Sequence, residues 1–384
     1  MPDVVVVGAG PVGTLLAGEL ARRGVDVVSV ERRADPAVGS RAIGVHAPVL
    51  GALEASGITE RLLDAAVRVR AGEARSGGRL LGAVRFDRLS VRFPFVATLP
   101  QTATFAALAA DAPPALRGEA IAVAGGPRPR VRVSADDGER EIEARIVVVA
   151  AGPRARALLW RPGAVRERAY PDRYVMADVP ADGGDVAVVN LDRGGVLESF
   201  PLPGGVRRFV AAVRGDVDAP EARTAALRSA LAARGLVAEA ARIERAEEFR
   251  IRRALAPALR RGALLAIGDT AHEVSPIGGQ GMNLGLLDAA TLAPLLARWV
   301  RTGEAPEPEL ARWERRRLAS ARVSGGIAVA NTVLGRPSGA RADAARASAL
   351  RLALATPAAR LLAHAYAMGF DRDARPVTDA SGRS

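Results

Sequence analysis

Residues 4–13 read VVVVGAGPVG, and this stretch decides the fold. The four valines form a short β-branched run, which predicts a buried parallel strand. Gly8, Gly10 and Gly13 follow with GxGxxG spacing. In that pattern the first glycine allows a tight turn, the second lets the backbone approach a pyrophosphate, and the third lets the next helix pack close to the strand. Helical spacing from Thr14 to Arg23 completes a strand–turn–helix unit, and we expect it to bind a dinucleotide.

A second strand and an acid follow at the expected distance. Residues 25–30 read VDVVSV, and Glu31 closes them, eighteen residues after Gly13. A carboxylate at that place can accept hydrogen bonds from a ribose diol. The helix that begins after Gly10 offers free N–H groups and a partial positive charge to phosphates. The two strands, the helix and the acid together predict a Rossmann-like domain.

A second informative segment, residues 262–283, reads GALLAIGDTAHEVSPIGGQGMN. A buried strand at 263–267 ends in Gly268-Asp269, a Pro- and Gly-rich loop follows, and a new helix begins near Gly281. Here the sequence resembles the class A flavoprotein monooxygenases of the para-hydroxybenzoate hydroxylase type, especially the actinobacterial aromatic polyketide hydroxylases. The resemblance covers roughly residues 1–330.

The resemblance implies that FAD is the cofactor and that this segment contacts the flavin. Asp269 would accept hydrogen bonds from the ribityl chain, and Pro276 would lie near the reacting edge. The backbone N–H groups from Gly279 to Asn283 open a helix, so they can stabilise negative charge on the flavin. His272 is open to two interpretations, a positional role beside the flavin or direct proton transfer. The catalytic candidates are therefore Pro276, Gly279 and His272.

Other family segments add cofactor contacts. Arg41 would bind the pyrophosphate, and Gln101, which follows Pro100, would contact FAD. The complete set of predicted FAD-binding residues is Gly8, Gly10, Pro11, Val12, Gly13, Glu31, Arg32, Arg41, Gln101, Gly268, Asp269, Pro276, Gly279, Gly281, Met282 and Asn283.

One loop departs from the family pattern. After the apolar run 146–149, the family has Asp-Gly and, a few residues later, Ser, whereas this chain has Ala151-Gly152 and Ala155. In the family this loop helps to bind both FAD and the transient NADPH or NADH. The substitution leaves open whether a nicotinamide reduces the flavin.

The resemblance implies a monooxygenase that hydroxylates or epoxidises an aromatic or polyketide-like small molecule through a flavin C4a-hydroperoxide, in secondary metabolism. The alternative is an FAD-dependent dehydrogenase, reductase or rearrangement enzyme that uses no external NAD(P)H, and the altered loop motivates it. A non-catalytic flavin-binding protein is a third possibility. A flavin-dependent halogenase is excluded, because its chemistry uses a lysine and this chain has none.

Composition excludes several other classes. The chain has 384 residues, no cysteine and a net charge of +12 that comes entirely from arginine. Disulfides, thiolate nucleophiles and a Walker-type phosphate loop are impossible. Aromatic residues make up only 4%, and no basic stretch is interleaved with them, so we expect no nucleic-acid partner. The run Arg315–Arg317 is interpreted as a solvated helix face. His46 and His364 lack clustered partners, so no metal site is expected.

No signal peptide or bilayer-spanning stretch is recognisable, so we expect a cytoplasmic monomer or homodimer without membrane contact. The expected fold is α/β with an α+β second domain: a Rossmann-like FAD-binding domain, an inserted mixed-sheet substrate domain and C-terminal helices. Candidate substrate-domain strands lie at 186–190, 196–200 and 207–213, and Glu141–Val149 is expected to be one returning hairpin strand. The expected boundaries are 1–70, 99–168 and 254–330 for the FAD-binding domain, 71–98 and 169–253 for the substrate-binding domain, and 331–384 for the C-terminal helical segment.

Overall fold

The computed structural model describes residues 1–35, 42–181 and 183–371. The valine run forms β1 (Val4–Val7), which lies inside a six-stranded sheet of order β18-β19-β12-β1-β2-β8. All neighbouring strands of this sheet are parallel except β18 and β19. The other strands are β2 (Val27–Glu31), β8 (Leu116–Arg117), β12 (Ile146–Val149), β18 (Arg260–Arg261) and β19 (Leu264–Ala266).

The valines of β1 are buried on both faces of the sheet. Val4 and Val6 belong to the core that the helices form on one face. Val5 and Val7 point the other way and pack in a second core with Val131. Because successive side chains of a strand face opposite sides, only a continuous apolar run can satisfy both environments.

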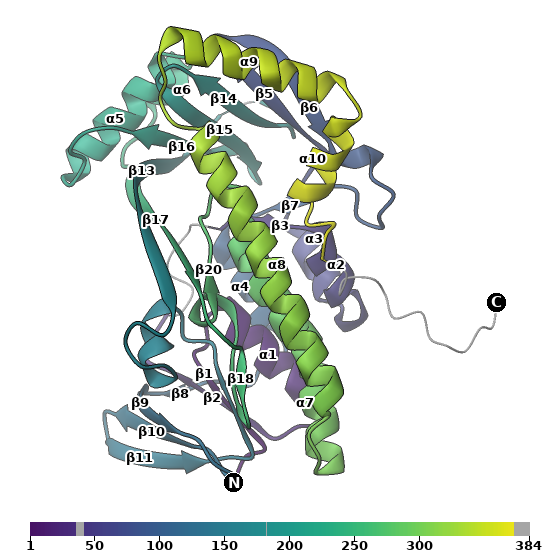
Figure 1. The fold of residues 1–384 in the computed structure, drawn as a ribbon. Helices are drawn as coiled ribbons and strands as arrows, with labels where there is room; N and C mark the ends of the chain where they lie inside the picture. Colours follow the sequence, from purple (N-terminus) through teal and green to yellow (C-terminus); the bar gives the residue numbers. More distant parts are fainter. Residues whose placement is uncertain (36–41, 182, 372–384) are drawn as a thin grey trace.

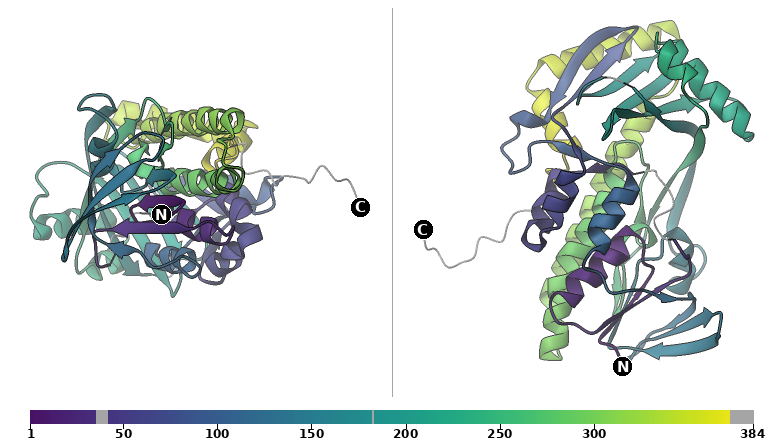
Figure 2. Two further views of the ribbon diagram at one scale, coloured as in Figure 1. Left: turned by 90° about the horizontal axis from the view of Figure 1, so that it is seen from below. Right: turned by 180° about the vertical axis from the view of Figure 1, so that it is seen from behind.

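Four helices cover the first face of this sheet, and Figure 2 shows them lying together in the view from behind. The helix α1 begins directly after the glycine turn and contacts both α4 and α7, and α7 contacts α8. Their bounds are α1 (Pro11–Ala21), α4 (Gln101–Ala109), α7 (Gln280–Thr302) and α8 (Glu307–Leu334).

A three-stranded antiparallel sheet covers the second face. It consists of β9 (Glu119–Ala124), β10 (Arg130–Ala135) and β11 (Gly138–Glu143). The expectation of one returning strand over Glu141–Val149 is wrong. The hairpin strand ends at Glu143, and Ile146–Val149 forms β12 beside β1 in the other sheet. The fully apolar run is buried between two layers, whereas the alternating run before it is half exposed.

The second large sheet has eight strands in the order β20-β17-β13-β16-β15-β14-β5-β6. Its longest strands, β13 and β17, run from the lower sheet up into this one (Figure 1). The strands are β5 (Ala71–Ser76), β6 (Arg79–Arg85), β13 (Arg166–Pro180), β14 (Ala187–Asp192), β15 (Gly195–Leu202), β16 (Val206–Val213), β17 (Glu247–Leu255) and β20 (His272–Glu273).

Different helices pack on the two faces of the eight-stranded sheet. Leu197 and Phe209 lie in an apolar core with Leu227 and Leu231 of α5 (Pro220–Ala232), next to α6 (Val237–Ala241). On the opposite face, the end of α8 contributes Leu334, and α9 (Ala340–Ala355) and α10 (Ala358–Tyr366) pack on β6.

Short elements lie between the two large sheets. A three-stranded sheet has the order β3-β7-β4. The bounds of the remaining elements are β3 (Gly44–Val45), β4 (Val67–Val69), β7 (Val96–Thr98), α2 (Ala47–Leu53), α3 (Ile58–Asp64) and the 3-10 turns η1 (Glu54–Ser56), η2 (Phe86–Arg88), η3 (Pro153–Leu158) and η4 (Gly268–Thr270).

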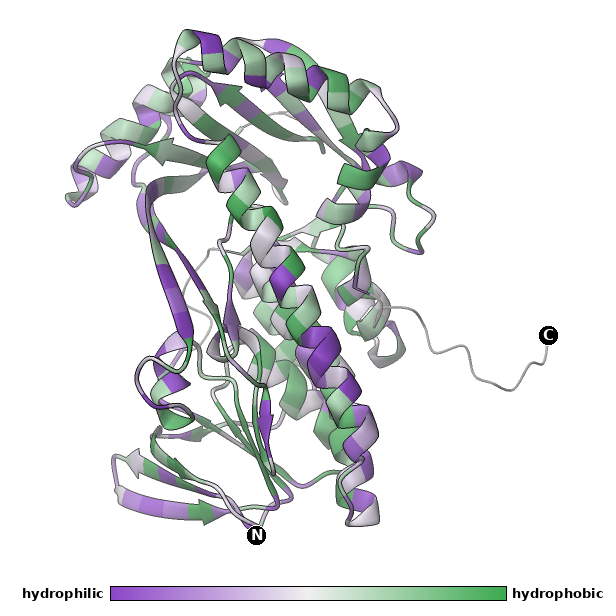
Figure 3. Cartoon of the chain, in the orientation of Figure 1, coloured by the Kyte–Doolittle hydropathy of each residue, from purple (hydrophilic) through white to green (hydrophobic). Residues whose placement is uncertain are grey.

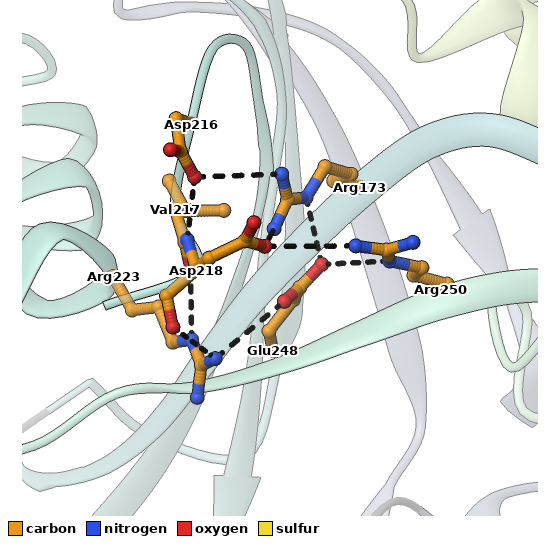
Figure 4. A network of polar contacts seen from close by, with 7 residues as sticks. All are labelled: Arg173, Asp216, Val217, Asp218, Arg223, Glu248 and Arg250. Atoms are coloured by element: carbon orange, nitrogen blue, oxygen red, sulfur yellow. Dashed lines mark hydrogen bonds and ion pairs between the residues drawn. The ribbon is translucent and has the colours of Figure 1, made fainter. Parts of the chain in front are cut away.

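A polar network fixes the loop in front of α5 to the two long strands (Figure 4). Arg173 of β13 donates to Glu248 of β17 at 2.7 Å and also pairs with Asp218 of the loop. Arg223 of α5 donates to the carbonyl oxygen of Val217 at 2.8 Å. The network links β13 and β17 of the second sheet to the loop in front of α5, at the edge of the core that α5 covers.

The interpretation of Arg315–Arg317 as a solvated face is only partly correct. Figure 3 colours much of the lower half of α8 hydrophilic, and Arg315 and Arg316 are exposed. Arg317 is completely buried, and its Nε donates to Asp288 at 2.7 Å. Three consecutive residues span most of a helical turn, so a run of arginines cannot all lie on one face.

The predicted α/β fold with a second mixed sheet and C-terminal helices is confirmed. Strands β5 and β6, from residues 71–85, join the sheet that residues 166–255 otherwise build. The domain boundaries themselves stay a prediction. Among the described residues, no helix is long and apolar enough to cross a membrane.

The contact between β1 and α1 gives a first test. A Cβ at Gly13 would lie 1.8 Å from the carbonyl oxygen of Gly8, so Gly13→Ala must push α1 away from the sheet. We expect the free energy of unfolding in urea to fall by about 1–3 kcal/mol. The control is Gly326→Ala in α8, where a Cβ meets nothing within 4 Å. It should leave stability unchanged or raise it by up to about 1 kcal/mol. Equal effects of the two variants would contradict the packing argument.

Candidate functional site

One cavity of about 1690 Å³ connects the two motifs singled out in the sequence with the eight-stranded sheet. It begins at the carboxyl ends of β1 and β2, passes the loop between β20 and α7, and reaches the face of the second sheet that α5 does not cover. The predicted cofactor residues that line it are Gly8, Gly10, Pro11, Val12, Glu31, Arg32, Gln101, Asp269, Pro276, Gly279, Gly281 and Met282.

The glycine turn after β1 has one tight side and one open side. Gly8 has φ +101°, and a Cβ there would lie 2.6 Å from the Cα of Ala151, so only glycine fits. A Cβ at Gly10 would meet only the Nη2 of Arg33, at 3.8 Å. The backbone at Gly10 therefore faces open cavity, at the N-terminus of α1, where the first-turn N–H groups have no partner inside the helix.

Glu31 closes β2 with a buried, ionised carboxylate at the cavity wall. Its Oε2 accepts from the N–H of Ala9 at 2.8 Å, and its Oε1 accepts from the N–H of Arg33 at 3.0 Å. Burial alone would raise the pKa of Glu31, but these N–H groups and the Arg33 guanidinium lower it overall. The turn and the acid are thus held together before any ligand binds.

The second motif forms the opposite wall. The strand β19 ends at Ala266, the turn η4 carries Asp269 to the cavity, and the chain returns through Pro276 to the start of α7. Gly278 and Gly279 have φ values of +97° and +68°, which only glycine adopts without strain. The free N–H groups of the first turn of α7 begin there.

The side chain of Asn283 and the backbone of His46 fix the start of α7. The Nδ2 of Asn283 donates to the carbonyl oxygens of Gly279 and Gly44, at 2.8 Å each, and its Oδ1 accepts from the N–H of His46 at 2.8 Å. Burial lowers the pKa of His46 to about 4, so the imidazole that lines the cavity is neutral near pH 7. Asn283 is completely buried, and its side chain acts on the backbone around the site.

His272 lies in a buried polar cluster behind the cavity. Its Nε2 is 2.6 Å from the Oδ2 of Asp288, and the same oxygen accepts from the N–H of Gly268 at 3.0 Å. His272 is 1% exposed and is not among the described residues that line the cavity. This geometry gives no support to direct proton transfer by His272. The residue supports the backbone that carries Asp269.

Arg317 completes this cluster from α8. It donates to Asp288, to the carbonyl oxygen of Leu284 at 3.2 Å and to Asp371 at 2.6 Å. Burial alone would raise the pKa of Asp288, but the facing His272 and Arg317 lower it overall. The carboxylate is therefore charged and fully compensated inside the core.

The loop with the unusual Ala151 is still attached to the Asp269 turn. The Oγ1 of Thr270 donates to the carbonyl oxygen of Gly152 at 3.1 Å. Arg156, which is buried, donates to the carbonyl oxygen of Asp269 at 2.8 Å and pairs with Glu273 at 3.0 Å. The loop thus keeps its structural connection although its family carboxylate is replaced.

Four predicted residues lie outside the cavity lining that the structure describes: Gly13, Gly268, His272 and Asn283. Gly13 and Gly268 act through close packing, since a Cβ at Gly268 would lie 3.3 Å from Val12. Arg41 falls outside the described residues.

Comparisons with known proteins agree with this geometry. The sequence profile described as "FAD binding domain" matches residues 1–324. The chain belongs to this FAD-binding family. It is 32% identical over 339 residues to 6-methylpretetramide 4-monooxygenase from Streptomyces rimosus, a match that covers 83% of this chain and 59% of that protein. The match to the family confirms FAD as the cofactor and confirms the resemblance to class A flavin monooxygenases.

Solved structures share the fold of this chain. OxyS anhydrotetracycline hydroxylase from Streptomyces rimosus has a TM-score of 0.77 and 27% identity, over 95% of this chain and 75% of that one. The p-nitrophenol 4-monooxygenase PnpA from Pseudomonas putida DLL-E4 has a TM-score of 0.85 over 97% of this chain and 99% of that one; at 23% identity it shows the fold alone. The chain spans about three fifths of the length of the first curated relative.

The residues present fit FAD at both ends of the cavity. One end has an open glycine backbone at a helix N-terminus and an ionised acid, which suit a pyrophosphate and a ribose. The other end has a second helix N-terminus behind two left-handed glycines, which suits a group that becomes negative on reduction.

Sequence reasoning missed the residues that hold this site together. Asp288 carried one available signal, because a lone acid interrupts the apolar stretch 284–293 of α7. A buried acid needs a partner, so a buried cation was to be expected. Nothing in the local pattern identifies Arg317 as that cation.

The buried cluster gives a second test. We expect Arg317→Met to lower the free energy of unfolding by about 3–5 kcal/mol, because it leaves Asp288 charged and buried beside one fewer donor. Urea titration measures this change. The matched control is Arg315→Met, an exposed position on the same helix, which should stay within about 0.5 kcal/mol of the parent. A loss below about 1 kcal/mol for Arg317→Met would refute a compensated buried charge.

Proposed function

We propose that the chain is an FAD-dependent monooxygenase that hydroxylates or epoxidises an aromatic or polyketide-like small molecule. One observation carries this proposal: the cavity is continuous from the FAD-binding motifs to a largely apolar face of the second sheet. A relative that is 32% identical is named 6-methylpretetramide 4-monooxygenase, and OxyS is named an anhydrotetracycline hydroxylase. Both names describe an enzyme that adds oxygen to the compound named.

In this proposal the bound FAD supplies the redox chemistry, with a nicotinamide as reductant and O2 as oxidant. Gly8, Gly10 and Val12 bind the pyrophosphate, and Glu31 binds the adjoining ribose. Asp269 binds the ribityl chain. The first-turn N–H groups of α7 stabilise negative charge on the flavin, and Pro276 borders the place where the substrate reacts.

The second sheet supplies the substrate wall. Met176, Val196 and Val210 lie on adjacent strands, face the cavity and pack in one cluster with Ile277, which follows Pro276. An apolar wall excludes water from the reacting atoms and suits a flat aromatic ring. The FAD-binding assignment above and this wall support a substrate position between the loop 276–279 and the sheet.

A second candidate function rests on Ala151. This residue lines the cavity. The resemblance to the class A monooxygenases implies an acid at this place that takes part in binding NAD(P)H. A dehydrogenase, reductase or rearrangement enzyme that uses no external nicotinamide has no need of that acid. The way in which the flavin is reduced therefore separates the two functions.

The experiment is a visible spectrum of the purified protein, followed by anaerobic addition of NADPH and of NADH. For the monooxygenase we expect a flavin spectrum that a nicotinamide bleaches. On admission of O2 with a polycyclic phenol, a product containing one oxygen atom from O2 should form. A bound flavin that neither nicotinamide bleaches, with conversion of substrate and no oxygen incorporation, would favour the second candidate.

Gly10 tests the assigned cofactor site. Gly10→Ala adds a methyl group that meets no protein atom closer than 3.8 Å but projects toward the proposed pyrophosphate. We expect the Kd for FAD to rise by about tenfold or more, about 1.4 kcal/mol, while the stability of the FAD-free protein stays unchanged. Fluorescence titration of the FAD-free protein with FAD measures the Kd. An unchanged Kd would place the cofactor away from this turn.

A further inference from the structure

A buried acid, Glu198, lies on the apolar substrate wall and has no role in the argument so far. It belongs to β15, where Val196, Glu198 and Phe200 face the cavity and Leu197 and Ser199 face the opposite side. Glu198 is 8% exposed and lines the cavity. Among the described residues, neither of its carboxylate oxygens has a hydrogen-bond or ion-pair partner.

Neighbouring polar groups are already engaged with other partners. Ser199, the next residue, accepts from the Nε of Arg207 at 2.8 Å. Arg208, on the adjacent strand and the cavity side, donates to both oxygens of Asp178, at 2.6 and 2.7 Å. Arg208 is thus a poor counter-ion for Glu198.

A tyrosine and an asparagine lie close to the same part of the cavity. The hydroxyl of Tyr366 donates to the Oδ1 of Asn331 at 2.6 Å, so its proton is already engaged. Asn331 in turn borders the flavin loop, since a Cβ at Gly278 would lie 3.1 Å from its Nδ2. Glu198, Tyr366 and Asn331 all line the cavity.

The raised pKa of Glu198 agrees with the absence of a hydrogen-bond partner among the described residues. Burial alone raises the pKa of Glu198 to about 7, with no offset from a cation or a hydrogen-bond donor. The acid also contributes to the raised pKa of Tyr366, for which burial is the larger cause. A buried polar group without a partner costs stability, and such groups concentrate where a ligand supplies the partner.

We propose that Glu198 determines substrate specificity by accepting a hydrogen bond from a hydroxyl group on the aromatic ring of the substrate. The acid selects a ring that donates a hydrogen bond at this position and disfavours a ring that carries a carboxylate there, because two acids would then share one apolar pocket. The inference rests on the proposed function, since it places the substrate on the same wall. It adds the residue that would recognise the hydroxyl group of the substrate.

The test compares three matched ligands of the FAD-loaded protein: 2-naphthol, naphthalene and 2-naphthoate. Perturbation of the flavin absorbance gives the Kd of each. We expect 2-naphthol to bind at least about tenfold more tightly than either of the others, because a hydrogen bond to a buried carboxylate is among the strong ones.

The variants Glu198→Leu and Glu198→Gln identify the acid as the cause. Glu198→Leu should remove the preference for 2-naphthol over naphthalene and keep FAD bound. Glu198→Gln should retain part of that preference and relieve the discrimination against 2-naphthoate. The control is Glu247→Gln, which changes an exposed carboxylate on the same sheet and should alter none of the three Kd values.

Three results would overturn the proposal: 2-naphthoate binding as tightly as 2-naphthol, a preference that survives in Glu198→Leu, or no binding of any of the three at millimolar concentration. Failure of the proposed function is a separate result. If no oxygen is incorporated into any product while the naphthol preference depends on Glu198, the binding site stands and the reaction is different. If oxygen is incorporated but the preference for 2-naphthol does not depend on Glu198, only the specificity inference fails.

Discussion

The carboxylate of Asp288 is the point on which the geometry of the site depends. It lies inside α7 and is completely buried. One oxygen accepts from the Arg317 guanidinium of α8, and the other meets His272 and the N–H of Gly268. Removing a charge from water costs several kcal/mol, so such a group persists only where donors surround it. Here the donors come from α8, from β20 and from the turn that carries Asp269.

The Asp288 cluster holds the Asp269 turn through the N–H of Gly268. A second cation, Arg156, holds the same turn through its carbonyl oxygens. Arg156 donates to the carbonyl oxygens of Asp269 and Thr270, at 2.8 and 3.3 Å, while Asn283 ties the start of α7 to the segment at Gly44. Arg156 and Asn283 thus hold backbone atoms of the cavity wall. These hydrogen bonds fix the wall without occupying the cavity. A preorganised wall loses less free energy on ordering when a ligand binds.

The features of the fold and site that could be predicted are those that depend on residues close together in the sequence. Gly13 must be glycine because a Cβ there would meet the carbonyl oxygen of Gly8, five residues earlier, and Glu31 lies at a fixed distance along the same unit. Arg317 could not be identified in this way. Its neighbours Arg315 and Arg316 share its chemistry, and only the packing of α8 on α7 distinguishes the buried arginine from the exposed ones. The same limit explains the split of Glu141–Val149, because which sheet a strand joins depends on partners more than a hundred residues away.

The substrate wall shows why composition alone cannot identify a recognition residue. A strand covered on both faces is expected to be apolar throughout, so the adjacent Glu198 and Ser199 of β15 both break the pattern. Their side chains point to opposite faces, and their surroundings differ. Ser199 is satisfied by Arg207, which also donates to the carbonyl oxygens of Gly183, Gly184 and Val186 and so serves the fold. Glu198 faces the cavity, and no described residue offsets its burial. Of the two polar residues, Ser199 is explained by its contacts within the protein, and Glu198 is the one that we propose a ligand in the cavity explains. A leucine at 198 would continue the cluster around Val196 and Val210 without the cost of burying an acid, so the carboxyl group is the feature of this wall that stability does not account for.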